Sequence, residues 1–294
     1  MLVPRGPGRF FGARAQGEGA FAVPSPRGEV PVHVYRPAAW TPDSPVWIVM
    51  HGRKRDADRD LADWKPAAER RGALLLVPSF GTATWPASLE YPAGNVVDGH
   101  GRPVERSGWA FSIVDRIFEV AVRRAGSRRE RFVLYGHGAG AQFVQRYVLF
   151  MGSRRVERAV AAGAGWYLLP DGDLDFPYGL REAKVSEATL RSALAAPLVV
   201  MVGLEDLETS GILRNNTQTL AQGATRVDRA RHFVERGRRS AVRLGAPFHW
   251  RLVEVRGVGH RPGAMLPAAE RVVMEPRAGG ARGTAGRPTT RPPP

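Results

Sequence analysis

Cysteine is absent from the 294-residue chain. Its absence excludes disulfide bonds, a thiolate nucleophile and any metal site built on cysteine. Long apolar runs are missing too, since none approaches the roughly 18 residues that suggest a membrane span. The segment from Met1 to Gly8 contains no apolar core long enough for a signal peptide. A cytoplasmic protein without a membrane span is therefore the expectation.

Lysine is scarce, because only Lys54, Lys65 and Lys184 occur and 40 of the 43 basic residues are arginines. The formal net charge is +15, which alone would suggest a nucleic-acid partner. The charge is dispersed, however, and the middle of the chain mixes both signs, as in residues 53–58. We expect weak, non-specific attraction to polyanions and no specific nucleic-acid partner.

The composition predicts one folded domain with non-globular ends. Hydrophobic residues make up 43% and charged residues 24% of the chain, as in ordinary globular proteins. Residues 277–294 contain only Arg, Ala, Gly, Thr and Pro, which leaves nothing to bury in a core. We therefore expect a flexible N-terminal segment over residues 1–18, a domain over residues 19–275 and a disordered basic tail over residues 276–294.

Short apolar runs alternate with segments of helical periodicity. Strands are predicted over residues 21–23, 30–35, 46–50, 73–77, 131–135, 159–161, 198–202 and 250–255. Helices are predicted over residues 56–71, 109–124, 143–151, 217–244 and 262–274, with a long loop over residues 79–103. This alternation indicates the α/β class, with a mostly parallel central sheet and helices on both faces. Ligands bind such sheets at the carboxyl ends of the strands.

Three features lie where that rule places a site. Residues 136–140 (GHGAG) form a tight turn between a strand and a helix, residues 203–206 (GLED) follow a buried strand, and residues 257–260 (GVGH) follow the last strand. Turn, acid and histidine occur in the chain order of the α/β-hydrolase triad. The pair His51-Gly52, after an early strand, lies where that fold builds half of its oxyanion hole.

On these residues the chain resembles the α/β-hydrolase superfamily, and within it the bacterial branch of polyhydroxyalkanoate depolymerases and feruloyl-type esterases. The resemblance covers about residues 20–275 and includes the stretch from Gly165 to Tyr167. It implies an α/β-hydrolase fold and carboxylic-ester hydrolase ancestry, with a small-molecule or polymeric ester as ligand. By resemblance, His260 is the general base and Asp206 its orienting carboxylate, with Glu205 and Glu208 as competing choices for the acid.

The resemblance also implies an oxyanion hole next to a nucleophile elbow. Its donors would be the backbone N–H of Ala139 and an N–H after Gly52, at Arg53. The family motif is G-x-S-x-G, and the serine position is Gly138, which has no hydroxyl. Losing the nucleophile costs a serine protease about 10⁶ in kcat and leaves roughly 10³–10⁴ over water. We therefore expect an impaired enzyme, a pseudoenzyme candidate; a natural and a deliberate replacement would look identical.

Two other functions compete with this interpretation. In one, His260 activates a bound water in the space left by the hydroxyl, and the protein is a working ester hydrolase. In the other, Gly136-x-Gly138-x-x-Ala141 is a dinucleotide-binding motif. That motif requires an acid at the end of the next strand, and residues 161–165 (AAGAG) supply none. A nicotinamide or flavin titration would decide the point, and no cofactor is expected.

The remaining candidates have simpler explanations beside the functional one. Asp206 also suits a helix N-cap, and His137 and His51 suit packing or loop support. Four aromatic side chains would line an apolar substrate cleft, although aromatic residues more often belong to the core: Trp85, Trp109, Trp166 and Tyr167. Four histidines show no metal-ligand spacing, so that no metal site is expected: His33, His100, His232 and His249. The sequence does not indicate an oligomeric state.

Overall fold

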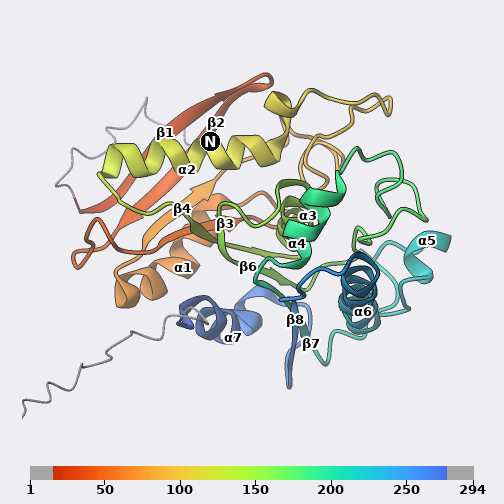
Figure 1. Ribbon diagram of the computed structural model, residues 1–294. Coiled ribbons are helices and arrows are strands. Elements are labelled where there is room, and N and C mark those ends of the chain that lie inside the picture. Colours follow the sequence, from red (N-terminus) through yellow and green to blue (C-terminus); the bar gives the residue numbers. More distant parts are fainter. Residues whose placement is uncertain (1–15, 277–294) are drawn as a thin grey trace, which may run out of the picture.

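The computed structural model describes residues 16–276 (Figure 1). The N-terminal segment 1–15 and residues 277–294 of the expected tail lie outside the described residues. The strands are β1 (Gly17–Ser25), β2 (Gly28–Arg36), β3 (Val46–Met50), β4 (Leu74–Pro78), β5 (Phe132–His137), β6 (Val156–Ala162), β7 (Leu198–Gly203) and β8 (Arg251–Val255). The helices are α1 (Ala57–Arg71), α2 (Ala110–Ala125), α3 (Ala139–Met151), α4 (Glu187–Leu194), α5 (Thr217–Leu220), α6 (Arg226–Leu244) and α7 (Pro262–Met274), with a 3₁₀ turn over Arg106–Gly108.

The eight strands form one sheet in the order β1-β2-β4-β3-β5-β6-β7-β8. β1 pairs antiparallel with β2, and β2 antiparallel with β4, whereas β4, β3, β5, β6, β7 and β8 run parallel. The prediction of a mostly parallel α/β sheet is confirmed. β1 begins at Gly17, two residues before the expected start of the domain.

Helices cover both faces of the sheet, as Figure 1 shows. One face carries α1 and α7, whose apolar residues pack with Trp47, Leu75 and Met201 of the strands. The other carries α2, α3, α4 and α6, which pack on the alternate strand residues, among them Ile48 and Leu134. Because both faces are covered, every residue of β3, β4, β5 and β7 is buried, which explains their continuous apolar runs.

The region 187–244 differs from the sequence expectation. A helix predicted over residues 217–244 is two helices, α5 and α6, because the chain restarts at a capping box on Thr225. The Thr225 hydroxyl accepts from the N–H of Asp228 (3.1 Å), and the Asp228 carboxylate accepts from the N–H of Thr225 (3.1 Å). Helix α4 was not predicted; Ser186 caps it by accepting from the Thr189 N–H (3.1 Å).

Gly140 lets α3 approach the sheet at the end of β3. A Cβ built at this position would overlap the backbone carbonyl oxygen of Met50. We therefore expect Gly140→Ala to lower the free energy of unfolding by about 1–3 kcal/mol, since backbone atoms cannot move aside cheaply. Urea denaturation followed by circular dichroism measures this loss.

The matched control is Gly263→Ala in the first turn of α7, where a Cβ would meet no atom within 4 Å. There we expect a gain of about 0.5–1 kcal/mol from the lower entropy of the unfolded chain. Similar midpoints for the two variants would show that α3 does not approach β3 as closely as described.

Candidate active site

The turn between β5 and α3 holds Gly138 at φ 58° and ψ −109°. A positive φ is sterically easy for glycine and strained for other residues. Two backbone hydrogen bonds fix the turn, because the N–H of Gly138 donates to the Ala162 carbonyl (2.9 Å) and its carbonyl accepts from the Gln142 N–H (3.1 Å). A Cβ built on Gly138 would lie 3.8 Å from His260 Nε2, with no closer atom. The space above Gly138 is therefore open.

Adjacent strands bring His260 and Asp206 together. β7 pairs with β8, and the loop after β7 is joined to the loop after β8 by the Glu205 N–H, which donates to the Val258 carbonyl (3.0 Å). His260 Nδ1 lies 2.9 Å from Asp206 Oδ2. A carboxylate only accepts, so Nδ1–H is the donor and Nε2 of the neutral ring is left to accept a proton on the side of Gly138.

Asp206 is almost fully buried and carries two further contacts. Its Oδ1 accepts from Nη1 of Arg226 (2.8 Å), whose side chain is 2% exposed. Burial raises the pKa of Asp206, but the hydrogen bond and charge of His260 and the charge of Arg226 outweigh it and lower the pKa below the ordinary value. Asp206 is therefore ionised at neutral pH. Of the competing acids, Glu208 contacts Arg226 (3.3 Å) rather than the histidine.

His137 lies beside His260, with 5.0 Å between the ring centroids, and both residues line the cavity described below. Burial, followed by the charge of His260, lowers the pKa of His137 to about 3, which keeps the ring neutral. Gly163 makes room for both rings: a Cβ there would lie 3.1 Å from His137 Nε2 and 3.4 Å from His260 Nδ1. The absence of a side chain at Gly163 thus permits the His260 position.

His51 supports the loop that follows β4. Its Nε2 accepts from the N–H of Phe80 (2.9 Å), and its carbonyl accepts from the Tyr91 hydroxyl (2.7 Å). The ring is buried, and burial lowers its pKa to about 3. His51 is therefore a neutral structural residue that fixes the backbone of the adjoining Gly52.

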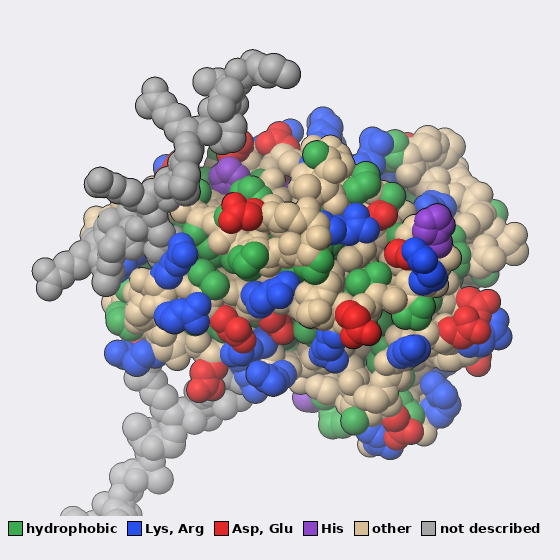
Figure 2. All heavy atoms as spheres, turned by 90° about the horizontal axis from the view of Figure 1, so that it is seen from above, with side chains coloured by type: hydrophobic (Ala, Val, Ile, Leu, Met, Phe, Trp, Pro, Cys, Tyr) green, Lys and Arg blue, Asp and Glu red, His purple; other side chains and the backbone are tan. Residues whose placement is uncertain are grey.

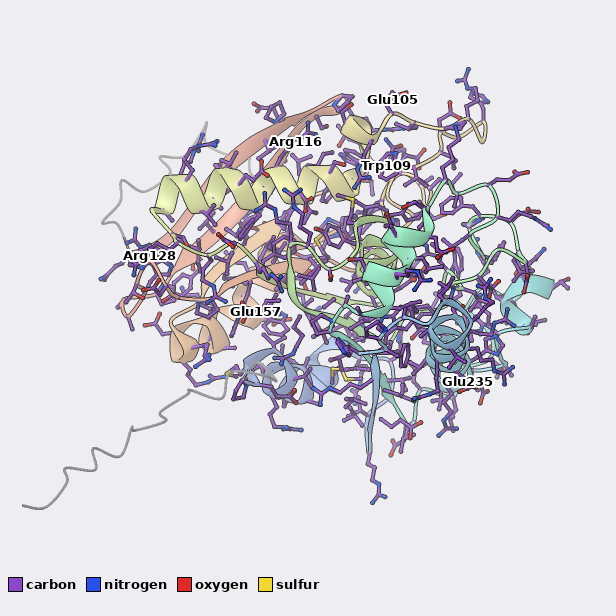
Figure 3. All side chains as sticks on the ribbon, in the orientation of Figure 1. Glu105, Trp109, Arg116, Arg128, Glu157 and Glu235 are labelled. Atoms are coloured by element: carbon purple, nitrogen blue, oxygen red, sulfur yellow. The ribbon has the colours of Figure 1, made fainter. Side chains whose placement is uncertain are left out.

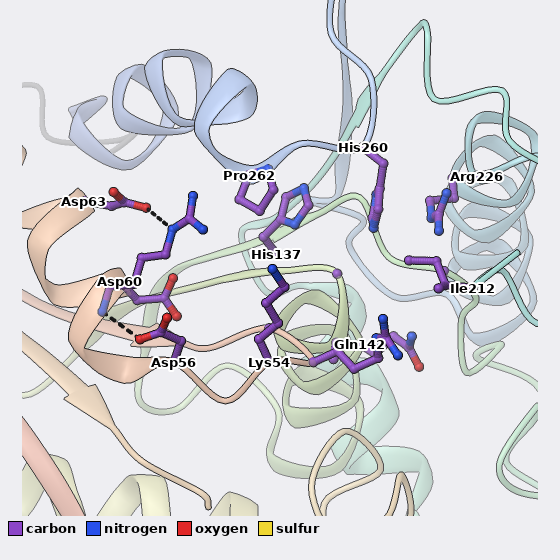
Figure 4. Close-up of a pocket in the computed structure, with 16 residues that line it drawn as sticks. Lys54, Asp56, Asp60, Asp63, His137, Gln142, Ile212, Arg226, His260 and Pro262 are labelled. Atoms are coloured by element: carbon purple, nitrogen blue, oxygen red, sulfur yellow. Dashed lines mark hydrogen bonds and ion pairs between the residues drawn. The ribbon is translucent and has the colours of Figure 1, made fainter. Parts of the chain in front are cut away.

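A cavity of about 280 Å³ opens in front of Gly138 (Figure 4). Five residues named by the sequence line it together with His260: Gly52, Arg53, His137, Gly138 and Ala139. Gly165, from the stretch that carries the resemblance, also lines it. Residues without a sequence signal complete the lining, namely the three aspartates of the α1 region on one side, Arg226 and Ile212 on the other, and Lys54, Arg59, Gln142 and Pro262. Asp206 lies behind His260 rather than in the lining.

The four aromatic candidates do not line this cavity. Trp85 packs edge-on against Phe80, and Tyr167 stacks on Phe233, both within the core. Trp109 lies at the start of α2 (Figure 3), where its Nε1–H donates to the Val104 carbonyl (2.8 Å). Trp166 lines a smaller cavity that shares the lining residue Gln142 with this one. Helical and strand periodicity cannot separate core aromatics from cleft aromatics, which is why the sequence grouped them.

Asp60 is a carboxylate of the cavity with a raised pKa. Burial and the nearby Asp63 and Asp56 raise the pKa of Asp60 to about 7. Because the folded pKa exceeds that of an unfolded aspartate, about 3.9, the folded state binds the extra proton and stability is lost as the pH rises from about 4 to about 7. We expect Asp60→Asn to raise Tm by several degrees at pH 8 and to leave it unchanged at pH 4, measured by thermal unfolding.

The exposed Asp58 of the same helix gives the control, since Asp58→Asn should show no such gain at pH 8. If Asp60→Asn kept the pH dependence of the wild type, the ionisation of Asp60 would not cause the loss of stability between pH 4 and pH 7.

Within residues 16–276, no group of three or more metal-ligating side chains is present. Over the same range, no helix is both long and apolar enough to cross a membrane.

A scan of protein-family models finds no match to the chain, and a search of curated proteins finds none either. Among solved structures, poly(aspartic acid) hydrolase-1 from Sphingomonas sp. KT-1 is 34% identical, with a TM-score of 0.85 over 88% of this chain and 99% of that chain. The poly(3-hydroxybutyrate) depolymerase LpqC from Bordetella parapertussis is 32% identical, with a TM-score of 0.84 over 88% and 91%. The S-formylglutathione hydrolase from Agrobacterium tumefaciens, at 14% identity and a TM-score of 0.57, shares the fold. The chain therefore belongs to the α/β-hydrolase superfamily, in the group of these depolymerase-like and esterase-like hydrolases.

Proposed function

We propose that the protein is an ester-hydrolase relative whose cleft binds an acyl ligand but is catalytically impaired, because Gly138 occupies the nucleophile position. One observation carries the proposal: the Cα–Cβ direction at Gly138 leads to His260 Nε2, 3.8 Å from the built Cβ. A serine hydroxyl at this place would donate to Nε2, as the triad requires. Glycine supplies no atom for that bond.

The other roles follow from the positions around the cavity. His260 is the general base, and Asp206 holds its tautomer and stabilises the imidazolium. Ala139 begins α3, where the first N–H groups have no intrahelical acceptor and attract negative charge. With an N–H at Arg53, beside Gly52, it would stabilise an oxyanion. All of these except Asp206 line one cavity.

The ligand class rests on the relatives. One is named for poly(aspartic acid) and the other for poly(3-hydroxybutyrate), both of which are polymers. We propose a carboxylic ester or a related acyl compound, small or polymeric, as the ligand of this cleft. On the face shown in Figure 2, basic side chains are interspersed with acidic and apolar ones and do not form a continuous basic patch. A nucleic-acid site would require such a patch, so we propose no specific nucleic-acid partner.

A panel of p-nitrophenyl esters tests the impairment. We expect the wild type to hydrolyse them near the background rate. The substitution His260→Ala should change that rate less than twofold, because Gly138 has no hydroxyl for His260 to deprotonate. The second candidate, hydrolysis by a His260-activated water, is favoured by the open space beside Nε2. Clear wild-type turnover that His260→Ala abolishes would replace impairment with that mechanism.

A further inference from the structure

A second cavity shares the lining residue Gln142 with the cleft. Its volume is about 20 Å³, which is room for one water-sized group. Two arginine side chains, Arg146 of α3 and Arg214, line it together with Trp166. The other lining residues are Ser88, Leu89, Pro92, Ala93 and Pro177.

Arg146 is fully buried and only partly hydrogen-bonded. Its Nη1 donates to the Gln142 carbonyl (2.9 Å), and its guanidinium lies 4.2 Å from the centroid of the Trp166 ring. Its Nε and Nη2 have no partner among the described residues. The ring stabilises the face of the guanidinium, but the N–H groups in the guanidinium plane stay unpaired.

Arg214 adds a second positive charge to the same place. Its guanidinium lies 5.2 Å from the Trp166 ring centroid, and its Nη1 donates to the Tyr178 hydroxyl (3.3 Å). Across residues 16–276, neither arginine forms an ion pair with a carboxylate. Burial and the nearby Arg214 lower the pKa of Arg146 to about 9, which still leaves it charged at neutral pH.

The other two fully buried arginines, Arg226 and Arg229, provide a comparison for the guanidinium contacts of Arg146. Arg226 pairs with the carboxylates of Asp206 and Glu208, although its Nε has no partner among the described residues. Arg229 donates to the carbonyls of Gly223 (2.8 Å) and Gly165 (2.7 Å), to that of Arg214 and to the Asn215 side chain. An unpaired buried charge destabilises the fold, because the charge loses its hydration and no protein acceptor replaces the lost water contacts. Arg146 differs from Arg226 in having no carboxylate partner, and from Arg229 in leaving both Nε and Nη2 without an acceptor.

We propose that this cavity binds one small monovalent anion, either a carboxylate group or a halide ion, between Arg146 and Arg214. A carboxylate accepts two parallel N–H bonds from a guanidinium edge, which is the arrangement left open at Nε and Nη2. The volume suits a halide ion or the oxygens of one carboxylate group that projects into the cavity, and it is too small for a whole sulfate or acetate ion.

The cavity has a direct structural relation to the cleft. Gly138, Gln142 and Arg146 are four residues apart and share one face of α3, so Arg146 lies about 12 Å beyond Gly138 along the helix. Gln142 lines both cavities. The acceptor at Arg146 would thus be either a free halide ion or the carboxylate at the distal end of a ligand held in the cleft.

Thermal unfolding of the full chain at constant ionic strength tests the site. Sodium chloride or bromide should give a saturable rise in Tm of about 3 °C relative to sulfate. Arg214→Gln and Arg146→Met should abolish the saturable part, and Arg243→Gln, an exposed arginine of α6, should retain it. A rise in Tm that does not saturate, or the same rise in Arg214→Gln as in the wild type, would overturn the proposal. Because Arg214 is exposed, we expect the Arg214→Gln variant to fold.

A second arm identifies the source of the anion and rests on the proposed function. In Gly138→Ser, we compare a p-nitrophenyl ester that ends in a free carboxylate with its methyl-capped form. If the ligand supplies the carboxylate, Arg214→Gln raises KM about 10-fold for the first ester alone. Equal KM values assign the site to a free ion. Failure of the proposed function would leave the Tm measurement unaffected, so the two failures are distinguishable.

Discussion

Gly138→Ser is expected to raise kcat/KM for p-nitrophenyl esters by a factor of about 10³ or more. The proposed base and its proposed carboxylate are already in contact, since His260 Nδ1 and Asp206 Oδ2 lie 2.9 Å apart. The new Cβ enters open space, 3.8 Å from Nε2. The hydroxyl then needs only a rotamer that points at Nε2. Initial rates of nitrophenolate release over a range of ester concentrations give both constants.

Two controls separate the hydroxyl from the side chain. Gly138→Ala adds the same Cβ without oxygen and should stay at background, and Gly138→Ser with His260→Ala should lose the gain. Backbone strain at φ 58° destabilises both Gly138 variants by about 1–3 kcal/mol. We therefore expect their Tm values to fall below that of the wild type by similar amounts. A well-folded Gly138→Ser without activity would show that the cleft residues do not form a catalytic arrangement.

Arg226→Met is expected to lower the free energy of unfolding by about 3–5 kcal/mol, because it leaves the buried Asp206 carboxylate without its cation. The Arg226 and Asp206 side chains are each 2% exposed, and 2.8 Å separates Nη1 from Oδ1. For a domain of this size we expect Tm to fall by roughly 10 °C, measured by differential scanning calorimetry.

Arg231→Met on the same helix provides the matched control. Arg231 pairs with Glu254 at 2.7 Å, but it is 54% exposed, so the loss should stay below about 1 kcal/mol. The pH dependence has a definite sign, since the pKa of Asp206 is lowered on folding. Its stabilisation is present above the ordinary aspartate pKa and disappears as the pH falls below it. Equal losses in the two variants would exclude a special role for the buried pair.

The sequence predicted the sheet and the three strand-end features because these depend on local patterns. Apolar runs mark buried strands, and the glycines at positions 136, 138 and 140 mark a turn where a helix closely follows a strand. Arg226 was not predicted, because its partner lies 20 residues away on another element. Among 40 arginines, nothing local distinguishes a buried one from an exposed one.

The pairing of Arg146 with Trp166 escaped prediction for the same reason. Arg146 lies in an apolar stretch of α3, where a solvent-exposed arginine is the usual interpretation. Its burial follows from how the loop carrying Trp166 packs over α3. Long-range packing of this kind decides which charged residues are enclosed, whereas periodicity records only which positions are apolar.

The open space above Gly138 has a genetic consequence. Two glycine codons, GGT and GGC, become the serine codons AGT and AGC by one change at the first base. The neighbouring residues need no adjustment, because the His260–Asp206 contact is formed without the serine and no atom occupies the place of its side chain. Where either of these two codons encodes Gly138, one point mutation places a hydroxyl beside His260, and growth on an ester as carbon source would select such mutants directly.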